Sequence, residues 1–138
     1  DLAKDLQTRH LTDRLPLQTS LGLCLLAAKA HGLAIVDGVY NAFKDDEGLQ
    51  VECEQGRDMG FDGKTLIHPA QVEVTNAAFS PTEEEVELAQ RQIDAFQAAE
   101  AAGQGVAVVD GKIVENLHVA TARDILARVD VIAALATE

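Results

Sequence analysis

The sequence predicts part of a parallel α/β fold, followed by a helix–hairpin–helix segment. Two short strand candidates, residues 33–36 and 64–67, alternate with helical segments, and this order is typical of βαβ units in a parallel sheet. Further along, Asp110-Gly111 separates two short apolar runs, and this pair tolerates the positive φ angles of a tight hairpin turn. Two strands cannot close a barrel, so we expect the parallel part to be incomplete.

The first half of the chain should contain helices around both strands. Residues 1–15 are polar and irregular, and Pro16 stands where the next helix begins. The helix at 17–30 is apolar on almost every face, which is typical of a helix wedged between a sheet and another element. His31-Gly32 ends it, because glycine is common just after the last turn. The other expected elements are the strand 33–36, a helix at 49–59, the strand 64–67 and a helix at 69–78.

The second half begins at Ser-Pro-Thr-Glu, residues 80–83. We expect Ser80 to cap a helix and Glu83 to complete a capping box. This start divides the chain into residues 1–79 and an extension at 80–138. The expected elements of the extension are a helix to residue 101, strands at 106–109 and 112–114, and a helix capped by Asn116 that runs to about residue 136.

Composition excludes several classes of protein. The chain has 138 residues, of which 47% are hydrophobic, and a net charge of −12, so it should form a core but is a poor partner for nucleic acid or an anionic membrane. Its two cysteines form no C-x-x-C pair, which favours free thiols and a cytoplasmic location. The longest apolar stretch, residues 21–30, is too short to span a bilayer.

One motif is specific enough to indicate a family. Residues 60–71 read GFDGKTLIHPAQ, and this run resembles the G-F-x-G-K-x-x-I-H-P-x-Q segment of the citrate lyase beta-subunit family, which includes the malyl-CoA and citramalyl-CoA lyases. The resemblance extends over nearly the whole chain. It implies the C-terminal part of a (β/α)₈ TIM barrel, about strands seven and eight with their helices, plus the family's C-terminal extension.

The resemblance also implies an activity. We expect a Mg²⁺-dependent carbon–carbon lyase that cleaves a malyl-, citramalyl- or citryl-type CoA thioester to acetyl-CoA and an oxo acid. Two alternatives remain open: a malyl-CoA thioesterase, and a non-catalytic assembly or regulatory module built from the same barrel. The expected partners are an acyl-CoA substrate and further copies of the chain, in a trimer or hexamer. Because the chain opens at Asp1 without a Met, we expect it to be a piece of a longer protein.

Two aspartates are candidate site residues. Asp1 begins the run DLAKDL, which resembles the family segment whose first Asp binds Mg²⁺ at the end of barrel strand six; without the resemblance it is an ordinary solvated residue. Active sites of such barrels lie at the carboxyl ends of the strands. Asp37 ends the strand 33–36, so it is expected either to line the substrate pocket or to orient loop amides.

The remaining site residues come from the family pattern. Ile67, His68 and Pro69 form the turn that shapes the pocket wall beside coenzyme A in the family, although His68 also suits a purely structural turn. Glu115 ends the run GKIVE, which resembles G-K-M-[IV]-D. In the family this Asp reaches from the extension of one subunit into the active site of a neighbour. Glu in its place either keeps an acid/base role or marks a subgroup that lacks it.

Other chemistry is not supported. Lys64 stands at the amino-terminal end of its expected strand, which places it near the face opposite the active site and makes it a poor candidate for a covalent intermediate. The acidic cluster at 45–47 suits a helix start. No zinc site is expected, because metal-ligand spacing is missing among His10, His31 and His118.

Overall fold

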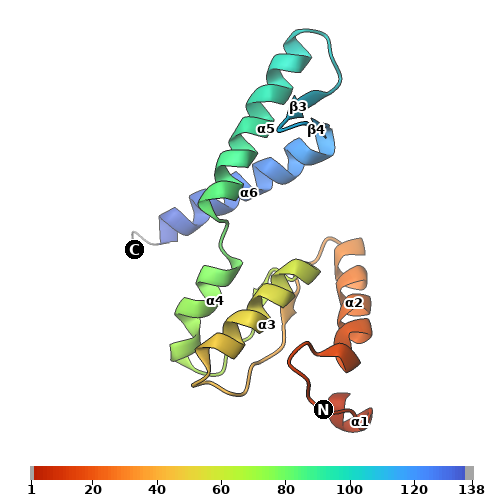
Figure 1. Cartoon of the computed structure of the whole chain (residues 1–138), viewed down its shortest axis with the longest axis vertical. Helices are drawn as coiled ribbons and strands as arrows, with labels where there is room; N and C mark the ends of the chain where they lie inside the picture. Colours follow the sequence, from red (N-terminus) through yellow and green to blue (C-terminus); the bar gives the residue numbers. More distant parts are fainter. Residues whose placement is uncertain (1, 136–138) are drawn as a thin grey trace. The chain divides into compact units, whose positions relative to one another are not determined.

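A computed structural model describes residues 2–135, which form two compact units divided between Phe79 and Ser80 (Figure 1). The first unit contains α1 (Leu2–Asp5), α2 (Leu15–Ala30), β1 (Val36–Asp37), α3 (Asp46–Met59), β2 (Gly63–Lys64), the 3₁₀ turn η1 (Pro69–Gln71) and α4 (Val72–Phe79). The second contains α5 (Glu83–Ala101), β3 (Ala107–Val109), β4 (Lys112–Val114) and α6 (Asn116–Leu135). Asp1, the expected Mg²⁺ ligand, lies outside the described residues.

The α/β character with a parallel strand pair is confirmed. In β1 and β2, Asp37 lies opposite Lys64. Backbone bonds extend the pairing, from Asp62 N to Ile35 O at 2.8 Å and from Thr65 N to Asp37 O at 3.0 Å. The predicted strand limits were wrong, because the ladder lies later than 33–36 on one strand and earlier than 64–67 on the other.

Side-chain caps explain the other shifts in element limits. Helix α3 starts three residues before the predicted 49, because the Asp45 side chain accepts a hydrogen bond from Gly48 N at 3.0 Å. Helix α5 is capped by Thr82, not Ser80, and Glu85 completes the capping box from the N3 position. The short helix α1 lies in a segment that we expected to be irregular.

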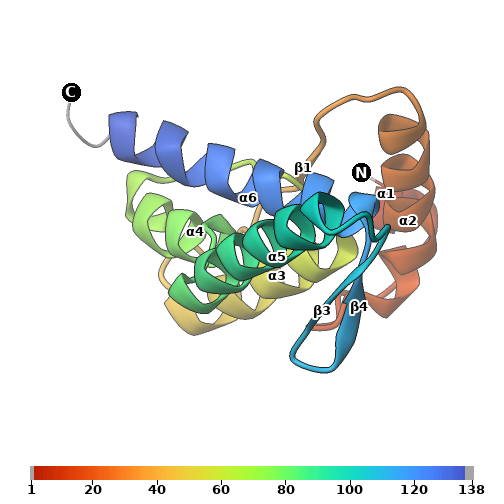
Figure 2. The same cartoon turned by 90° about the horizontal axis from the view of Figure 1, so that it is seen from above.

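Helices α3 and α4 pack against each other and hold much of the core of the first unit (Figure 2). Cys53 on α3 is fully buried, and its Sγ lies 3.7 Å from Thr75 Oγ1 on α4. Burial raises the pKa of the Cys53 thiol, and this outweighs the opposing hydrogen bond. The buried apolar residues of this core are Leu25, Leu49, Cys53, Phe61 and Phe79.

Helix α2 keeps much of its apolar surface exposed. Leu23 and Leu26 are 63% and 71% exposed, and Val36 on β1 is 56% exposed. We therefore expect residues 1–138, expressed alone, to aggregate or to form a molten state, because large apolar surfaces favour association. Size-exclusion chromatography and thermal melting test this. A monomeric product with a cooperative melt would contradict the interpretation of a partial barrel.

The second unit is a pair of helices joined by a hairpin (Figure 1). Strands β3 and β4 are antiparallel, with Val108 opposite Ile113. Asp110 and Gly111 adopt φ of 50° and 75° at the turn, as expected for an Asp-Gly hairpin. Asn116 is the first residue of α6 and not its cap. The buried residues are Ala89, Ile93, Phe96, Ala99, Ala107, Val114, Val119 and Ala122. No helix within residues 2–135 is long and apolar enough to cross a membrane.

Candidate functional site

An open cleft of about 510 Å³ lies in the first unit, beside the carboxyl end of β1. Three segments line it: the polar stretch before α2 with the start of that helix, the loop after β1, and the first turns of α3. The cleft therefore lies where an α/β fold places its active site. Its polar lining includes Arg9, His10, Thr12, Arg14, Asp37, Tyr40, Asn41 and Glu52.

Asp37 lies at the base of this cleft and is 1% exposed. Its Oδ1 accepts hydrogen bonds from Arg14 Nη1 and from Gly38 N, both at 2.8 Å. Its Oδ2 accepts from Arg14 Nη1 at 2.7 Å and from Lys64 Nζ at 3.2 Å. Asp37 thus both lines the cleft and orients a loop amide, the two roles left open by the sequence. A role in binding substrate stays a prediction.

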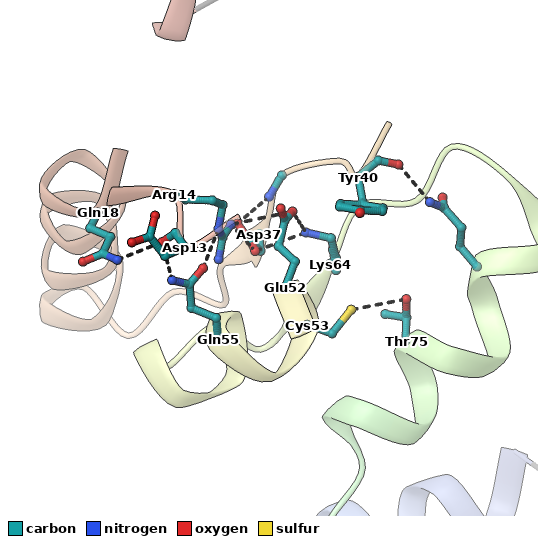
Figure 3. Close-up of polar contacts among 12 residues, drawn as sticks. Asp13, Arg14, Gln18, Asp37, Tyr40, Glu52, Cys53, Gln55, Lys64 and Thr75 are labelled. Atoms are coloured by element: carbon teal, nitrogen blue, oxygen red, sulfur yellow. Dashed lines mark hydrogen bonds and ion pairs between the residues drawn. The ribbon is translucent and has the colours of Figure 1, made fainter. Parts of the chain in front are cut away.

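Lys64 lies on β2, and its side chain is fully buried. Its Nζ donates to Glu52 Oε1 at 2.6 Å and to Asp37 Oδ2 (Figure 3). The expectation that Lys64 lies near the opposite face was wrong, because Lys64 pairs in register with Asp37 and its ammonium group contacts the carboxylates that line the cleft. Buried charges require such partners, since desolvation of an unpaired charge is costly.

Arg14 completes this cluster from the segment before α2. Its backbone is left-handed, with φ 53° and ψ 27°, which is uncommon for a residue other than glycine. Its Nε donates to Gln55 Oε1 at 2.7 Å, and Gln55 Nε2 donates to Asp13 O at 2.6 Å. The buried Nη2 has no hydrogen-bond partner within the described part of the chain.

Tyr40 closes another side of the cleft. Its hydroxyl donates to Asp45 Oδ2 at 2.7 Å, while its carbonyl accepts from the buried Gln71 Nε2 at 2.9 Å. The hydrogen bond to Asp45, with a smaller contribution from burial, raises the pKa of Tyr40 to about 12. The same bond lowers the pKa of Asp45. Within the acidic cluster at 45–47, Asp45 therefore caps the start of α3 and also holds the hydroxyl of Tyr40 in place.

This contact predicts the titration of Tyr40. Its ordinary pKa is about 10, so we expect tyrosinate absorbance to develop near pH 12 and, in Asp45→Asn, closer to pH 10. Because the folded state keeps its proton at a higher pH than the unfolded state, stability contributed by this group falls as pH rises from 10 to 12. The measurement is the difference titration between the protein and Tyr40→Phe. Equal midpoints with and without Asp45 would contradict it.

The expected coenzyme A turn follows β2. His68 is exposed, caps η1 by accepting Ala70 N on Nδ1 at 3.1 Å, and stacks on Phe43 with ring centroids 4.7 Å apart. Ile67 is 51% exposed, and its N–H donates to Gln71 Oε1 at 3.1 Å. Pro69 opens η1. The structural turn is therefore present, and ligand contact by these residues stays a prediction.

Glu115 belongs to the second unit, between β4 and α6, and is exposed. Its backbone N–H donates to His118 Nδ1 on α6 at 3.0 Å. This contact between the hairpin and the helix therefore uses the backbone of Glu115 and not its carboxylate. The catalytic role expected of Glu115 stays a prediction.

No cluster of metal-ligating side chains is found in the described part of the chain. Among residues 2–135, no group of three or more His, Cys, Asp or Glu side chains is arranged to hold a metal. The two carboxylates of the cleft, Asp37 and Glu52, already pair with the cations of Arg14 and Lys64. Mg²⁺ is usually bound by one or two carboxylates together with water and substrate oxygens, and Asp1, the ligand expected from the sequence, lies outside the described residues.

Sequence reasoning missed Arg14, Glu52 and Lys64 as members of this site. Lys64 stands within the motif at 60–71. Its position in that motif, at the end of an expected strand, was the sequence signal that could have placed it in the site. Arg14 and Glu52 have no local signal, because their partners lie 12 to 23 positions away along the chain.

Residues 20–133 match the protein family described as C–C bond lyase of the TIM-barrel fold. This chain belongs to that family. The match covers most of the chain, and the expected resemblance to citrate lyase beta subunits is thereby confirmed.

Curated proteins with different names are similar to this chain. A (3S)-malyl-CoA thioesterase of Cereibacter sphaeroides is 72% identical over 97% of this chain and 47% of its own length. The citrate lyase subunit beta of Leuconostoc mesenteroides is 35% identical over 91% of this chain and 42% of its own length. The L-malyl-CoA/beta-methylmalyl-CoA lyase of C. sphaeroides is 32% identical over 91% and 39%. The chain thus spans less than half the length of these relatives.

A solved structure adds to these similarities. The CitE protein of Mycobacterium tuberculosis, in complex with magnesium, acetoacetate and coenzyme A, is 32% identical, with a TM-score of 0.66 over 80% of this chain and 40% of that one. A citrate lyase of Burkholderia xenovorans has a TM-score of 0.71 at 22% identity, which supports the fold alone. These structures agree with an α/β fold for this chain.

Proposed function

We propose that the enzyme carrying this chain hydrolyses the thioester of (3S)-malyl-CoA. The 72% identity to a protein named (3S)-malyl-CoA thioesterase, over 97% of the chain, carries this proposal. The cleft is consistent with it, since Arg9 and His10 on its wall offer donors to an anionic thioester in an otherwise acidic chain. The thioesterase was an alternative at the level of the sequence, and the identity favours it over the lyase.

Carbon–carbon cleavage is the second candidate. It is supported by the family and by relatives named citrate lyase subunit beta and malyl-CoA lyase, at 35% and 32% identity. The two reactions start from the same substrate and differ in their products. Hydrolysis of malyl-CoA adds water and gives malate and free coenzyme A, whereas cleavage gives acetyl-CoA and glyoxylate.

A product assay on the full-length enzyme separates these functions. We expect (3S)-malyl-CoA to yield malate and coenzyme A thiol in equal amounts, measured by chromatography and a thiol reagent. Acetyl-CoA with glyoxylate as the main products would instead establish the lyase. Absence of turnover across malyl-, citramalyl- and citryl-CoA would favour the non-catalytic module.

Mg²⁺ dependence is part of the proposal. It is supported by the magnesium in the complex of the CitE protein, which is 32% identical to this chain, and Asp1 is the residue of this chain proposed to hold the ion. A bound Mg²⁺ would supply Lewis-acid polarisation of substrate oxygens. We expect EDTA to abolish turnover and added Mg²⁺ to restore it, and full activity in EDTA would contradict the proposal. A homo-oligomer, trimer or hexamer, is also proposed, and light scattering of the full-length enzyme tests it.

A further inference from the structure

The cluster at the base of the cleft contains equal numbers of positive and negative charges. Two cations, Arg14 and Lys64, face two carboxylates, Asp37 and Glu52, and the four side chains are 10%, 0%, 1% and 15% exposed. A buried ion needs its partner, because loss of one charge leaves the opposite one desolvated and unpaired. The structure therefore makes the position of each member depend on the other three.

The two cations share their partners. Asp37 Oδ2 accepts from Arg14 Nη1 at 2.7 Å and from Lys64 Nζ at 3.2 Å. Glu52 Oε1 lies 2.6 Å from Lys64 Nζ but 3.9 Å from Arg14 Nη1. Lys64 thus satisfies Glu52 and leaves Arg14 to Asp37 (Figure 3). Without the ammonium group, both carboxylates would compete for one guanidinium, and Arg14 would be drawn towards Glu52.

Arg14 in turn fixes the wall of the cleft. The side chain of Arg14 does not cap helix α2, and residue 14 has the left-handed backbone described above. Asp13 holds the helix start locally, because its Oδ1 accepts from Leu15 N at 3.1 Å. The Arg14 guanidinium and Gln55, which bonds both Arg14 Nε and Asp13 O, tie this segment to the rest of the unit. Residues 9–12, which precede this anchor directly, line the cleft. A shift of Arg14 therefore moves the side chains that face the ligand.

We propose that Lys64 is a positioning residue for the cleft: by pairing with Glu52 and Asp37 it holds Arg14 and the wall at residues 9–12 in the arrangement that binds substrate. Lys64 does not itself line the cleft, so it acts through residues that do. The inference rests on the proposed function in one respect, since it takes the acyl-CoA ester as the occupant of the cleft.

The test uses charge balance in the full-length enzyme. Lys64→Met keeps most of the side-chain length and leaves the cluster with one excess negative charge. We expect its KM for (3S)-malyl-CoA to rise on the order of 10-fold to 100-fold, which corresponds to about 1.4 to 2.7 kcal/mol of lost binding free energy, with a smaller change in kcat. Lys64→Met with Glu52→Gln has one cation and one carboxylate again, and its KM should return towards that of the unmodified enzyme.

A matched control separates this effect from the loss of any lysine ion pair. Lys29 pairs with Asp62 at 2.8 Å in the same unit, but it is half exposed and does not line the cleft. Lys29→Met should leave KM and kcat unchanged. Loss of folded enzyme alone would lower the apparent kcat without raising KM. A raised KM in Lys64→Met therefore indicates a positioning role and not a loss of folded protein.

Three outcomes would overturn the proposal: an unchanged KM in Lys64→Met, a fall in kcat alone, or a double variant no better than the single one. If Lys64→Met does not fold, Glu52→Gln carries the test, because it removes the same 2.6 Å ion pair and should also raise KM. If the unmodified enzyme does not turn over malyl-CoA, the proposed function fails. The inference is then judged by calorimetry with coenzyme A, where Lys64→Met should weaken binding and the double variant should restore it.

Discussion

Replacement of Glu115 by Gln should lower turnover by a factor of about 10² to 10⁴, the usual loss when a general acid or base is removed. The change keeps the shape of the side chain, and the junction with α6 depends on the Glu115 N–H and not on its carboxylate. Substrate affinity should therefore change little. Steady-state kinetics of the full-length enzyme measure both constants, and Glu84→Gln, at an exposed position on α5, is the matched control.

Mixing experiments test whether Glu115 serves a neighbouring subunit. Inactive Glu115→Gln and inactive Asp1→Asn enzymes are combined under conditions where subunits exchange. If the extension reaches the neighbour's site, some hybrid sites carry both intact residues and activity partly returns. Activity that stays absent despite demonstrated exchange would place Glu115 in its own subunit's site or outside catalysis.

Asp37→Asn should destabilise the enzyme by about 3–5 kcal/mol, the scale for breaking a buried ion pair by removing one partner. Asp37 is 1% exposed and accepts from both cations of the cluster. The amide keeps the shape of the carboxylate but leaves Arg14 and Lys64 with Glu52 as their remaining anion. Urea unfolding of the full-length enzyme measures the loss of free energy.

An exposed ion pair provides the control for this prediction. Asp110 bonds Arg91 at 2.8 Å, with both side chains about half exposed, and Asn also tolerates the positive φ of that turn. Asp110→Asn should therefore leave the unfolding free energy nearly unchanged, because solvent screens such pairs. Equal losses in Asp37→Asn and Asp110→Asn would show that burial of the first pair has no energetic consequence.

Local signals were sufficient for much of the fold. The Asp-Gly pair predicted the hairpin, and His31-Gly32 predicted the end of α2. The capping frame of α5 was ambiguous, because the glutamates at 83–85 place a Glu three residues after both Ser80 and Thr82. Pro81 in the first turn favoured Ser80 in the sequence, whereas the structure uses Thr82.

The site was less predictable than the fold. Asp37 was found because it ends a strand, a local feature. The cluster around it joins residues that are 12 to 41 positions apart, and such pairings leave no period in the sequence. The limits of β1 and β2 failed for a related reason, since the register of two short strands is set by contacts between them and not by either apolar run.

The buried thiol of Cys53 can report how often helices α3 and α4 separate. Its thiol is enclosed between α3 and α4, and its raised pKa keeps it protonated at neutral pH, so an alkylating reagent reaches the reactive thiolate only after the two helices separate. The rate of its modification under native conditions therefore reports how often that pair opens. Mass spectrometry can follow this modification of Cys53. A slower rate in the presence of ligand would show that occupancy of the cleft slows the separation of α3 and α4.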